Sequence, residues 1–174
     1  PDGEPRFRCI YVGGGSATSH GASLGETGRQ RIRDFYYNGG GYTGSCAGAF
    51  LCSTGTASVP VKEEYLHIWP GRTKNANLTV AYTGMDVPPD SALLDYYDFG
   101  GDNYVASVAH NLGCYVIEGN PNYWALGTEV LATYALPVET DDTIWDEDML
   151  GNASCWAYKD DAESGRLCPC GSHP

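Results

Sequence analysis

The sequence predicts an α/β fold in which a mostly parallel β-sheet is flanked by helices. An apolar run at residues 7–12 ends in the three glycines 13–15, as a buried strand followed by a loop would. A helical pattern at 26–38 then stops at glycine, and a short strand at 42–46 precedes a small-residue helix at 47–52. Strands and helices that alternate in this order indicate parallel strands joined by helical crossovers.

The second half of the chain predicts further strands in a less regular pattern. Apolar or alternating runs predict strands at 65–69, 78–82 and 130–134. Residues 153–158 and 166–170 flank a polar turn, which predicts two strands joined as a hairpin.

Composition limits the classes to which the protein can belong. Its 174 residues suffice for one domain with its own core, and no repeat or linker divides residues 1–174. With 10 Lys and Arg against 22 Asp and Glu, a net charge of −12 leaves no basic stripe of the kind that nucleic acid requires. No apolar run is long enough to cross a membrane. We therefore expect neither nucleic acid nor a membrane as a partner.

The sequence predicts no cofactor and no metal site. The seven cysteines do not have the spacing of zinc ligands. The acidic run at 141–148 lacks the central glycine and the final glutamate of a calcium-binding loop, so a solvated loop is the simpler interpretation.

The cysteines instead favour an extracellular protein with disulfides. Seven is an odd number, so three pairs would leave one thiol free. The predicted hairpin brings Cys155 near Cys168 or Cys170, and the sequence leaves that pairing open. Asn77 and Asn152 stand in glycosylation sequons, which also indicate secretion. The alternative is an intracellular protein whose thiols are all reduced.

Residues 44–48 have the form Gly-x-nucleophile-x-Gly between a short strand and a helix. In such a turn the nucleophile has a strained backbone, and glycines on both sides let the neighbouring backbone approach closely. Cys46 is therefore the predicted nucleophile. The N–H of Ala47 is predicted to stabilise an oxyanion, together with Gly14 or Gly15 of the loop after the first strand.

Two alternatives remain open for this segment. Ser45 is a second candidate nucleophile, although a position one residue earlier would point its side chain into the sheet. Cys46 could also be a structural half-cystine, with Cys52 as a partner. The other six cysteines can form three bridges without Cys46, which favours a free thiol.

Five segments along the chain resemble known motifs. Residues 12–15 resemble a Pro-Gly-Gly oxyanion loop, with Val in place of Pro, and residues 39–50 resemble a cysteine nucleophile segment. Residues 96–101 are similar to a tyrosine-rich Gly-Gly segment, 129–134 to a Val-Leu-Ala-x-Tyr strand, and 171–174 to the start of a Gly-x-His-Pro-Glu motif. With these motifs in this order, the chain resembles the class I glutamine amidotransferase-like superfamily, and within it most closely the biotin-protein ligase N-terminal-like domain family.

This resemblance implies a flavodoxin-like sheet and a catalytic role for His173. From the residues alone, no spacing rule selects the partner of a thiolate among His20, His67, His110 and His173, and the first three have simpler interpretations as loop, packing and turn residues. The family motif selects His173. The motif's glutamate would follow Pro174, the last residue of the sequence. We therefore expect a further segment that begins with Glu, in the same chain or in a second one.

The glycine-rich turns at strand ends favour a ligand crevice at the carboxyl ends of the strands. Tyr42, Gly100 and Gly101 are predicted to contact the substrate there, although a core position is the alternative for Tyr42.

These inferences lead to a secreted cysteine-nucleophile hydrolase that cleaves a small amide or a peptide bond through a thioester. The alternative is an amidotransferase-like binding or structural protein without turnover.

Overall fold

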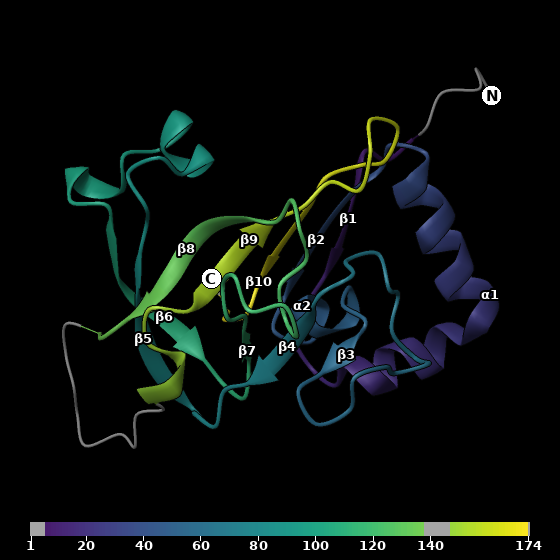
Figure 1. The fold of residues 1–174 in the computed structure, drawn as a ribbon, viewed down its shortest axis with the longest axis horizontal. Helices are drawn as coiled ribbons and strands as arrows, with labels where there is room; N and C mark the ends of the chain where they lie inside the picture. The colour runs from purple at the N-terminus through teal and green to yellow at the C-terminus, as the bar shows by residue number, and fades with distance from the viewer. Residues whose placement is uncertain (1–5, 138–146, 174) are drawn as a thin grey trace.

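The computed structural model describes residues 6–137 and 147–173, so Pro174 and most of the acidic run 141–148 lie outside the described residues. Figure 1 shows the arrangement of the helices and strands. In chain order the elements are β1 (Cys9–Val12), α1 (Ala17–Tyr37), β2 (Gly41–Ser45), α2 (Ala47–Leu51), β3 (Gly55–Thr56), β4 (Arg72–Asn75), β5 (Ala81–Asp86), η1 (Ala92–Asp95), η2 (Phe99–Gly101), β6 (Tyr104–His110), β7 (Cys114–Tyr115), β8 (Glu129–Ala135), η3 (Glu147–Met149), β9 (Ala153–Ala157) and β10 (Leu167–Cys170).

The main sheet is mixed, so the predicted helix-flanked parallel sheet of flavodoxin type is wrong. Its seven strands follow the order β1-β2-β10-β9-β8-β5-β6, and a small sheet holds β3, β4 and β7. Only β1, β2 and β10 pair in parallel within the large sheet, and its other pairs are antiparallel. Parallel neighbours need a long crossover, usually a helix, whereas antiparallel neighbours do not. After α2, the only helical segments among the described residues are short 3₁₀ turns. Within that part of the chain, the strands β5, β6, β8 and β9 therefore have no helical crossovers between them, which accounts for their antiparallel pairing.

The large sheet curls until the chain beyond β10 meets the far edge strand β6. His173, three residues after β10, pairs with Ala109 of β6, and its N–H donates to the Ala109 carbonyl at 2.8 Å. Figure 1 accordingly shows the C-terminal end in the middle of the molecule rather than at its rim. This curl brings the residues after β10 close to β6 as well as to α2.

The predicted strand at 65–69 is a loop, and the predicted strand at 78–82 begins only at Ala81. In the first segment Leu66 and Trp69 are fully buried in the core. The Trp69 ring packs against Trp156 of β9 with ring centroids 5.1 Å apart. The apolar run at 65–69 therefore reflects burial of an irregular segment and not a strand.

Helix α1 is longer than the helix predicted at 26–38, because the glycine- and serine-rich stretch before it is also helical. The side chain of Ser16 caps the helix by accepting a hydrogen bond from the N–H of Ser19 at 3.2 Å. Gly25 kinks the helix with φ 60° and ψ 174°, a conformation that glycine adopts readily.

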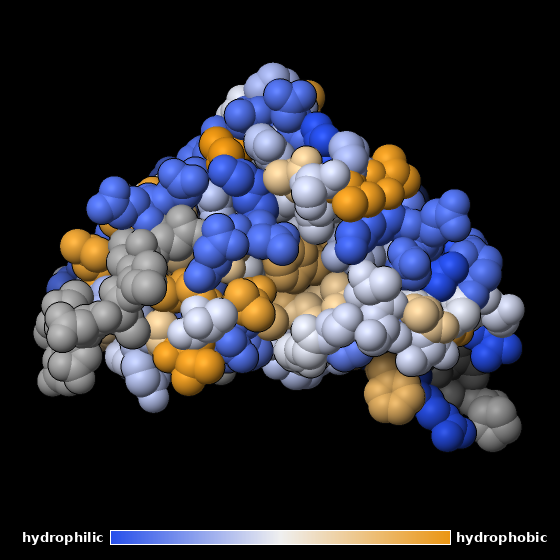
Figure 2. Space-filling view, turned by 90° about the horizontal axis from the view of Figure 1, so that it is seen from below, coloured by the Kyte–Doolittle hydropathy of each residue, from blue (hydrophilic) through white to orange (hydrophobic). Residues whose placement is uncertain are grey.

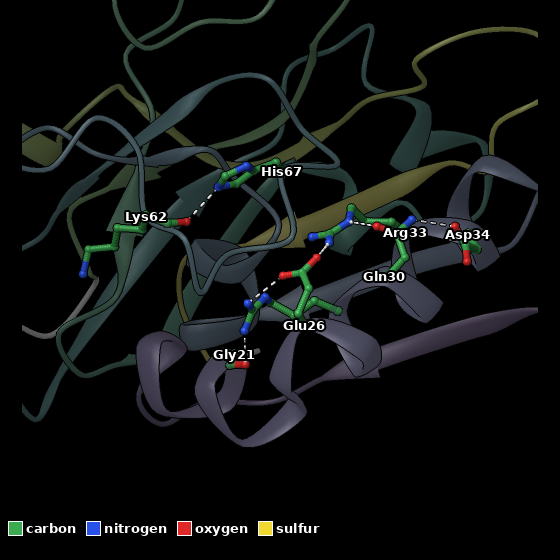
Figure 3. A network of polar contacts seen from close by, with 8 residues as sticks. Gly21, Glu26, Gln30, Arg33, Asp34, Lys62 and His67 are labelled. Carbon is green, nitrogen blue, oxygen red and sulfur yellow. Dashed lines mark hydrogen bonds and ion pairs between the residues drawn. The ribbon is translucent and has the colours of Figure 1, made fainter.

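A polar network spans this kink of α1 (Figure 3). The Arg29 guanidinium donates to the Gly21 carbonyl at 2.7 Å, and it also pairs with Glu26 at 2.7 Å. Glu26 forms a second ion pair with Arg33. The hydrogen bond from Arg29 lowers the pKa of the Glu26 carboxyl below its ordinary value of 4.5.

Replacing Glu26 with glutamine is expected to lower the melting temperature slightly at pH 7 and to have a smaller effect in acid. A carboxyl with a lowered pKa in the folded protein stabilises the fold above its unfolded-state pKa, and this contribution is lost as the pH falls through the lowered pKa. Thermal unfolding of both proteins between pH 7 and pH 3 measures the difference. Glu63→Gln is the control, since Glu63 is exposed and forms no ion pair among the described residues. An effect of Glu26→Gln that did not change with pH would contradict the ion-pair explanation.

All seven cysteines are free thiols, so the predicted disulfides are wrong. Cys155 and Cys170 face each other across β9 and β10, but a hydrogen bond joins their thiols, and it raises the pKa of Cys155. Cys52 and Cys114 are fully buried, and burial raises the pKa of both thiols. A count of cysteines could not show this, because bridging depends on the distance and direction between side chains in the fold.

Candidate active site at the turn after β2

Cys46 lies in a strained turn between β2 and α2. Its backbone has φ 50° and ψ −106°, a combination that residues with a Cβ rarely adopt. The Cys46 N–H donates to the Cys170 carbonyl at 2.9 Å, which ties the turn to the end of β10. A Cβ on Gly44 would lie 2.6 Å from the Gly48 carbonyl carbon, so the strand and the helix approach as closely as the sequence predicts.

The imidazole of His173 and the Cβ of Cys46 both lie beside Gly14. An ideal Cβ built on Gly14 would lie 2.5 Å from Cε1 and 3.1 Å from Nδ1 of His173. The same point is 3.7 Å from the Cβ of Cys46. The fold therefore brings close together the glycine backbone at position 14, the cysteine at position 46 and the histidine at position 173, which are far apart in the sequence. Gly14 can occupy this position because it has no side chain.

The predicted oxyanion donors border the same space. Ala47 is the first residue of α2, so its N–H has no acceptor within the helix. Gly14 lies beside the His173 ring, whereas Gly15, with φ 130°, lies beside the His20 ring. A Cβ on Gly15 would be 2.9 Å from Nε2 of His20, which projects from the first turn of α1. His20 thus borders the glycine loop on the side of α1.

The thiol of Cys46 is almost covered. Cys46 is 5% exposed, and its Sγ lies 3.8 Å from the carbonyl oxygen of Asn111, which follows β6. The Asn111 side chain in turn accepts a hydrogen bond from the N–H of Val80 at 3.4 Å. No motif in the sequence marks Asn111 or Val80, and their contact with the turn depends on the curl of the sheet.

The predicted substrate residues do not lie with Cys46. Tyr42 is 1% exposed, and its hydroxyl donates to the Gly48 carbonyl at 2.7 Å, so it supports the turn from inside the core. Gly100 and Gly101 are in η2, before β6, whereas Asn111 follows the other end of that strand. A seven-residue strand is about 23 Å long, so β6 separates the two glycines from the thiol. In Figure 1 the η1–η2 segment projects from the side of the sheet away from α2.

The two remaining histidines have polar contacts with Lys62 and Ser172. Nε2 of His67 lies 2.7 Å from the carbonyl oxygen of Lys62, and both residues belong to the loop that packs on α1 (Figure 3). His110 is buried at the end of β6, with Nδ1 2.8 Å from Oγ of Ser172. The alternative nucleophile Ser45 is also buried, and its hydroxyl lies 2.9 Å from that of Tyr11.

A surface hollow of about 360 Å³ lies at the opposite ends of β1 and β2 from Cys46. Its lining residues precede β1 or β2 or belong to α1, and they are Phe7, Arg8, Arg31, Asp34, Phe35, Asn38, Gly39 and Gly40. It is therefore separate from the space between Cys46 and His173.

The described residues contain no group of three or more His, Cys, Asp or Glu side chains arranged to hold a metal ion. No helix among these residues is long and apolar enough to cross a membrane. Of the two sequon residues, Asn77 is exposed, whereas Asn152 is partly buried and its side-chain amide donates to the Asp148 carbonyl at 2.8 Å.

Comparison with known proteins finds similarity in structure but not in sequence. No family model matches the chain, and no curated protein sequence matches it. The cold-adapted beta-galactosidase from Rahnella sp. R3 superposes on 97% of this chain with a TM-score of 0.50 and 13% identity. The match covers 19% of that enzyme, so the chain spans about a fifth of the beta-galactosidase it resembles. This level of likeness describes the fold alone.

Two further structures match with lower scores. The beta-galactosidase from Bacillus circulans sp. alkalophilus has a TM-score of 0.45 at 13% identity, with 97% of this chain and 19% of that one covered. A ThuA-like protein from Bacteroides uniformis ATCC 8492 has a TM-score of 0.47 at 12% identity, with 99% and 85% covered. Nothing about function follows from either similarity.

Proposed function

We propose that the protein is a cysteine-nucleophile hydrolase that cleaves an amide or peptide bond through a thioester. The observation that carries this proposal is that His173 and Cys46 both lie beside Gly14, with Cys46 on a strained turn. Strained backbone persists only where the surrounding structure holds it, and it is common at catalytic sites. A thiol with an adjacent imidazole is the arrangement that activates a cysteine nucleophile.

The chemistry follows from these positions. His173 accepts the thiol proton of Cys46, and the thiolate attacks the carbonyl carbon of the amide. The N–H of Ala47 and the glycine loop at Gly14 donate hydrogen bonds to the oxyanion that forms. The C–N bond breaks as His173 returns the proton to the nitrogen, and the amine leaves. His173 then deprotonates a water molecule, which attacks the thioester, so that the acid is released and the Cys46 thiol is restored.

The more specific parts of the proposal depend on sequence motifs. Membership of the class I glutamine amidotransferase-like superfamily rests on the motif resemblance, with the order of the nucleophile turn and the His-Pro segment as its main support. Secretion rests on the two sequons, of which Asn77 is exposed, and the seven free thiols lend it no support. The activity and substrates of any longer protein that contained this chain would be further proposals.

Alkylation of the native protein by iodoacetamide, followed by mapping of each cysteine by mass spectrometry, tests the proposal. Cys9 is exposed, so it provides an internal standard for a thiol without activation. We expect Cys46 to react faster than Cys9 at neutral pH although it is nearly buried. Loss of a proton-transfer partner typically lowers a rate about 100-fold or more. His173→Asn is therefore expected to slow Cys46 by about 100-fold and to leave Cys9 unchanged.

An active ester such as p-nitrophenyl acetate provides the second readout. A hydrolase of this type is expected to form an acyl adduct on Cys46 that hydroxylamine removes, and Cys46→Ser is expected to lose fast acylation. If Cys46 reacted more slowly than Cys9 and did not respond to His173→Asn, the hydrolase proposal would be wrong.

The second candidate function is a binding or structural protein without turnover. The cover over the thiol favours it, since Cys46 is 5% exposed and its Sγ faces the Asn111 carbonyl. On this alternative the turn is retained for packing, and Cys46 stays unreactive in the alkylation experiment above.

A further inference from the structure

The outer face of β5 and β6 is continuous with the position of His173. Tyr82 of β5 is directly opposite Ala109 of β6, and Ala109 is directly opposite His173. Side chains at paired positions of neighbouring strands project from the same face of a sheet. Tyr82, Ala109 and His173 therefore form one row, in which the small Ala109 is the only side chain between the other two.

Exposure along the two strands agrees with this row. Tyr82 is 62% exposed and Ala109 is exposed, whereas their neighbours Ala81 and His110 are buried. Neighbouring strands are about 4.8 Å apart, so the backbones of Tyr82 and His173 are about 10 Å apart. A tyrosine ring at that distance can contact a group held next to the thiol of Cys46.

Two strained apolar residues border the same row. Val80 is 84% exposed with φ 45°, and Leu112 is 55% exposed with φ 52°. Both lie next to Asn111, whose carbonyl faces the Cys46 thiol and whose side chain accepts from the Val80 N–H. A β-branched or bulky residue with positive φ is a rare conformation, and the fold here uses it twice to hold apolar side chains in solvent.

This surface has no charge. Residues 78–84 and 104–114 contain no Asp, Glu, Lys or Arg, and their only histidine is the buried His110. Figure 2 views the molecule from below, the side on which the β4–β5 and β6–β7 connections lie, and it shows hydrophobic atoms gathered near the middle of this face. A charged group bound here would lose water without gaining an ionic partner.

We infer that Val80, Tyr82 and Leu112 form an apolar subsite that binds a large neutral group, preferably aromatic, next to the scissile amide. The inference rests on the proposed function, since the bound group is positioned by its attachment to the amide that Cys46 attacks. When an apolar group of a substrate covers exposed apolar side chains, both surfaces leave water, and this burial favours binding. The substrate class is therefore a neutral amide or peptide with a bulky apolar residue at the cleaved bond.

Two alkylating agents that differ only in an aromatic group test the subsite. The rates of Cys46 alkylation by N-benzyl-2-chloroacetamide and by 2-chloroacetamide are compared, and the same ratio at Cys9 corrects for intrinsic reactivity. Burial of a phenyl group favours the larger reagent by about tenfold or more. Tyr82→Ala and Leu112→Ser are each expected to remove most of that preference, measured as the ratio of the two rates within each variant.

Tyr96→Ala is the matched control, because Tyr96 is an 89% exposed tyrosine at the end of η1, remote from Cys46. It is expected to keep the full preference. If 2-chloroacetamide labels Cys46 rapidly but the benzyl reagent has no advantage, or keeps its advantage in both variants, the subsite is wrong and the hydrolase proposal stands. If neither reagent labels Cys46 faster than Cys9, the hydrolase proposal fails and the subsite fails with it.

Discussion

Replacing Gly14 with alanine is expected to lower the alkylation rate of Cys46 about 100-fold, while Gly13→Ala leaves that rate within about twofold. A Cβ on Gly14 would lie 2.5 Å from Cε1 of His173, far inside contact distance, so the ring must move away from the thiol. Displacement of a catalytic group by about 1 Å can reduce a rate about 100-fold. The atom nearest to a Cβ on Gly13 would be Cε1 of Tyr11 at 3.8 Å, which is an ordinary van der Waals contact.

The pair of variants separates position from folding. Both glycines lie in the loop after β1, and thermal unfolding of the two proteins should show similar midpoints. The double variant Gly14→Ala/His173→Asn is expected to react no more slowly than His173→Asn alone, because both changes remove the same interaction. An unchanged Cys46 rate in Gly14→Ala would mean that His173 does not act from its position beside Gly14.

The sequence predicted the first third of the fold well because that region carries its own local signals. Glycine exits, a helical period and a Gly-x-Cys-x-Gly turn indicate β1, the second part of α1, β2 and α2 close to their observed bounds. The remainder is governed by pairing between distant segments. The last strand, β10, enters the sheet between β2 and β9, and no local pattern records such an insertion. Strands as short as β3 and β7, of two residues each, have no measurable period.

The candidate site divides in the same way. Cys46 and Ala47 could be chosen from one continuous turn, and Gly14 and His173 from a loop and a terminal motif. The structure brings these four residues together, although their catalytic roles remain predictions. Residues on β5 and β6 could not be chosen, because their nearness to His173 comes from the curl of the sheet. Gly100 and Gly101 precede β6, whereas Asn111 follows that strand, and their contact with a substrate stays a prediction.

Replacing Gly48 with alanine is expected to lower the free energy of unfolding by about 1–3 kcal/mol, the usual penalty for forcing extra atoms into a packed core. A Cβ on Gly48 would lie 2.2 Å from the Val12 carbonyl oxygen. Val12 belongs to β1 and Gly48 to α2, so neither backbone segment can move away easily. The Gly48 carbonyl also accepts the hydrogen bond from the buried Tyr42 hydroxyl, so any shift of α2 strains that bond as well.

Urea denaturation of Gly48→Ala against Gly13→Ala measures this effect, and an unchanged midpoint would show that α2 can move away from β1 without loss. Such freedom would also undermine the site, because the positive φ of Cys46 needs rigid support on both sides of the turn. The strand approaches from Gly44 and the helix from Gly48, so each glycine permits the contact that holds Cys46 in its strained conformation. We therefore expect Gly48→Ala to slow the alkylation of Cys46 in the protein that remains folded, which links the stability of the turn to its reactivity.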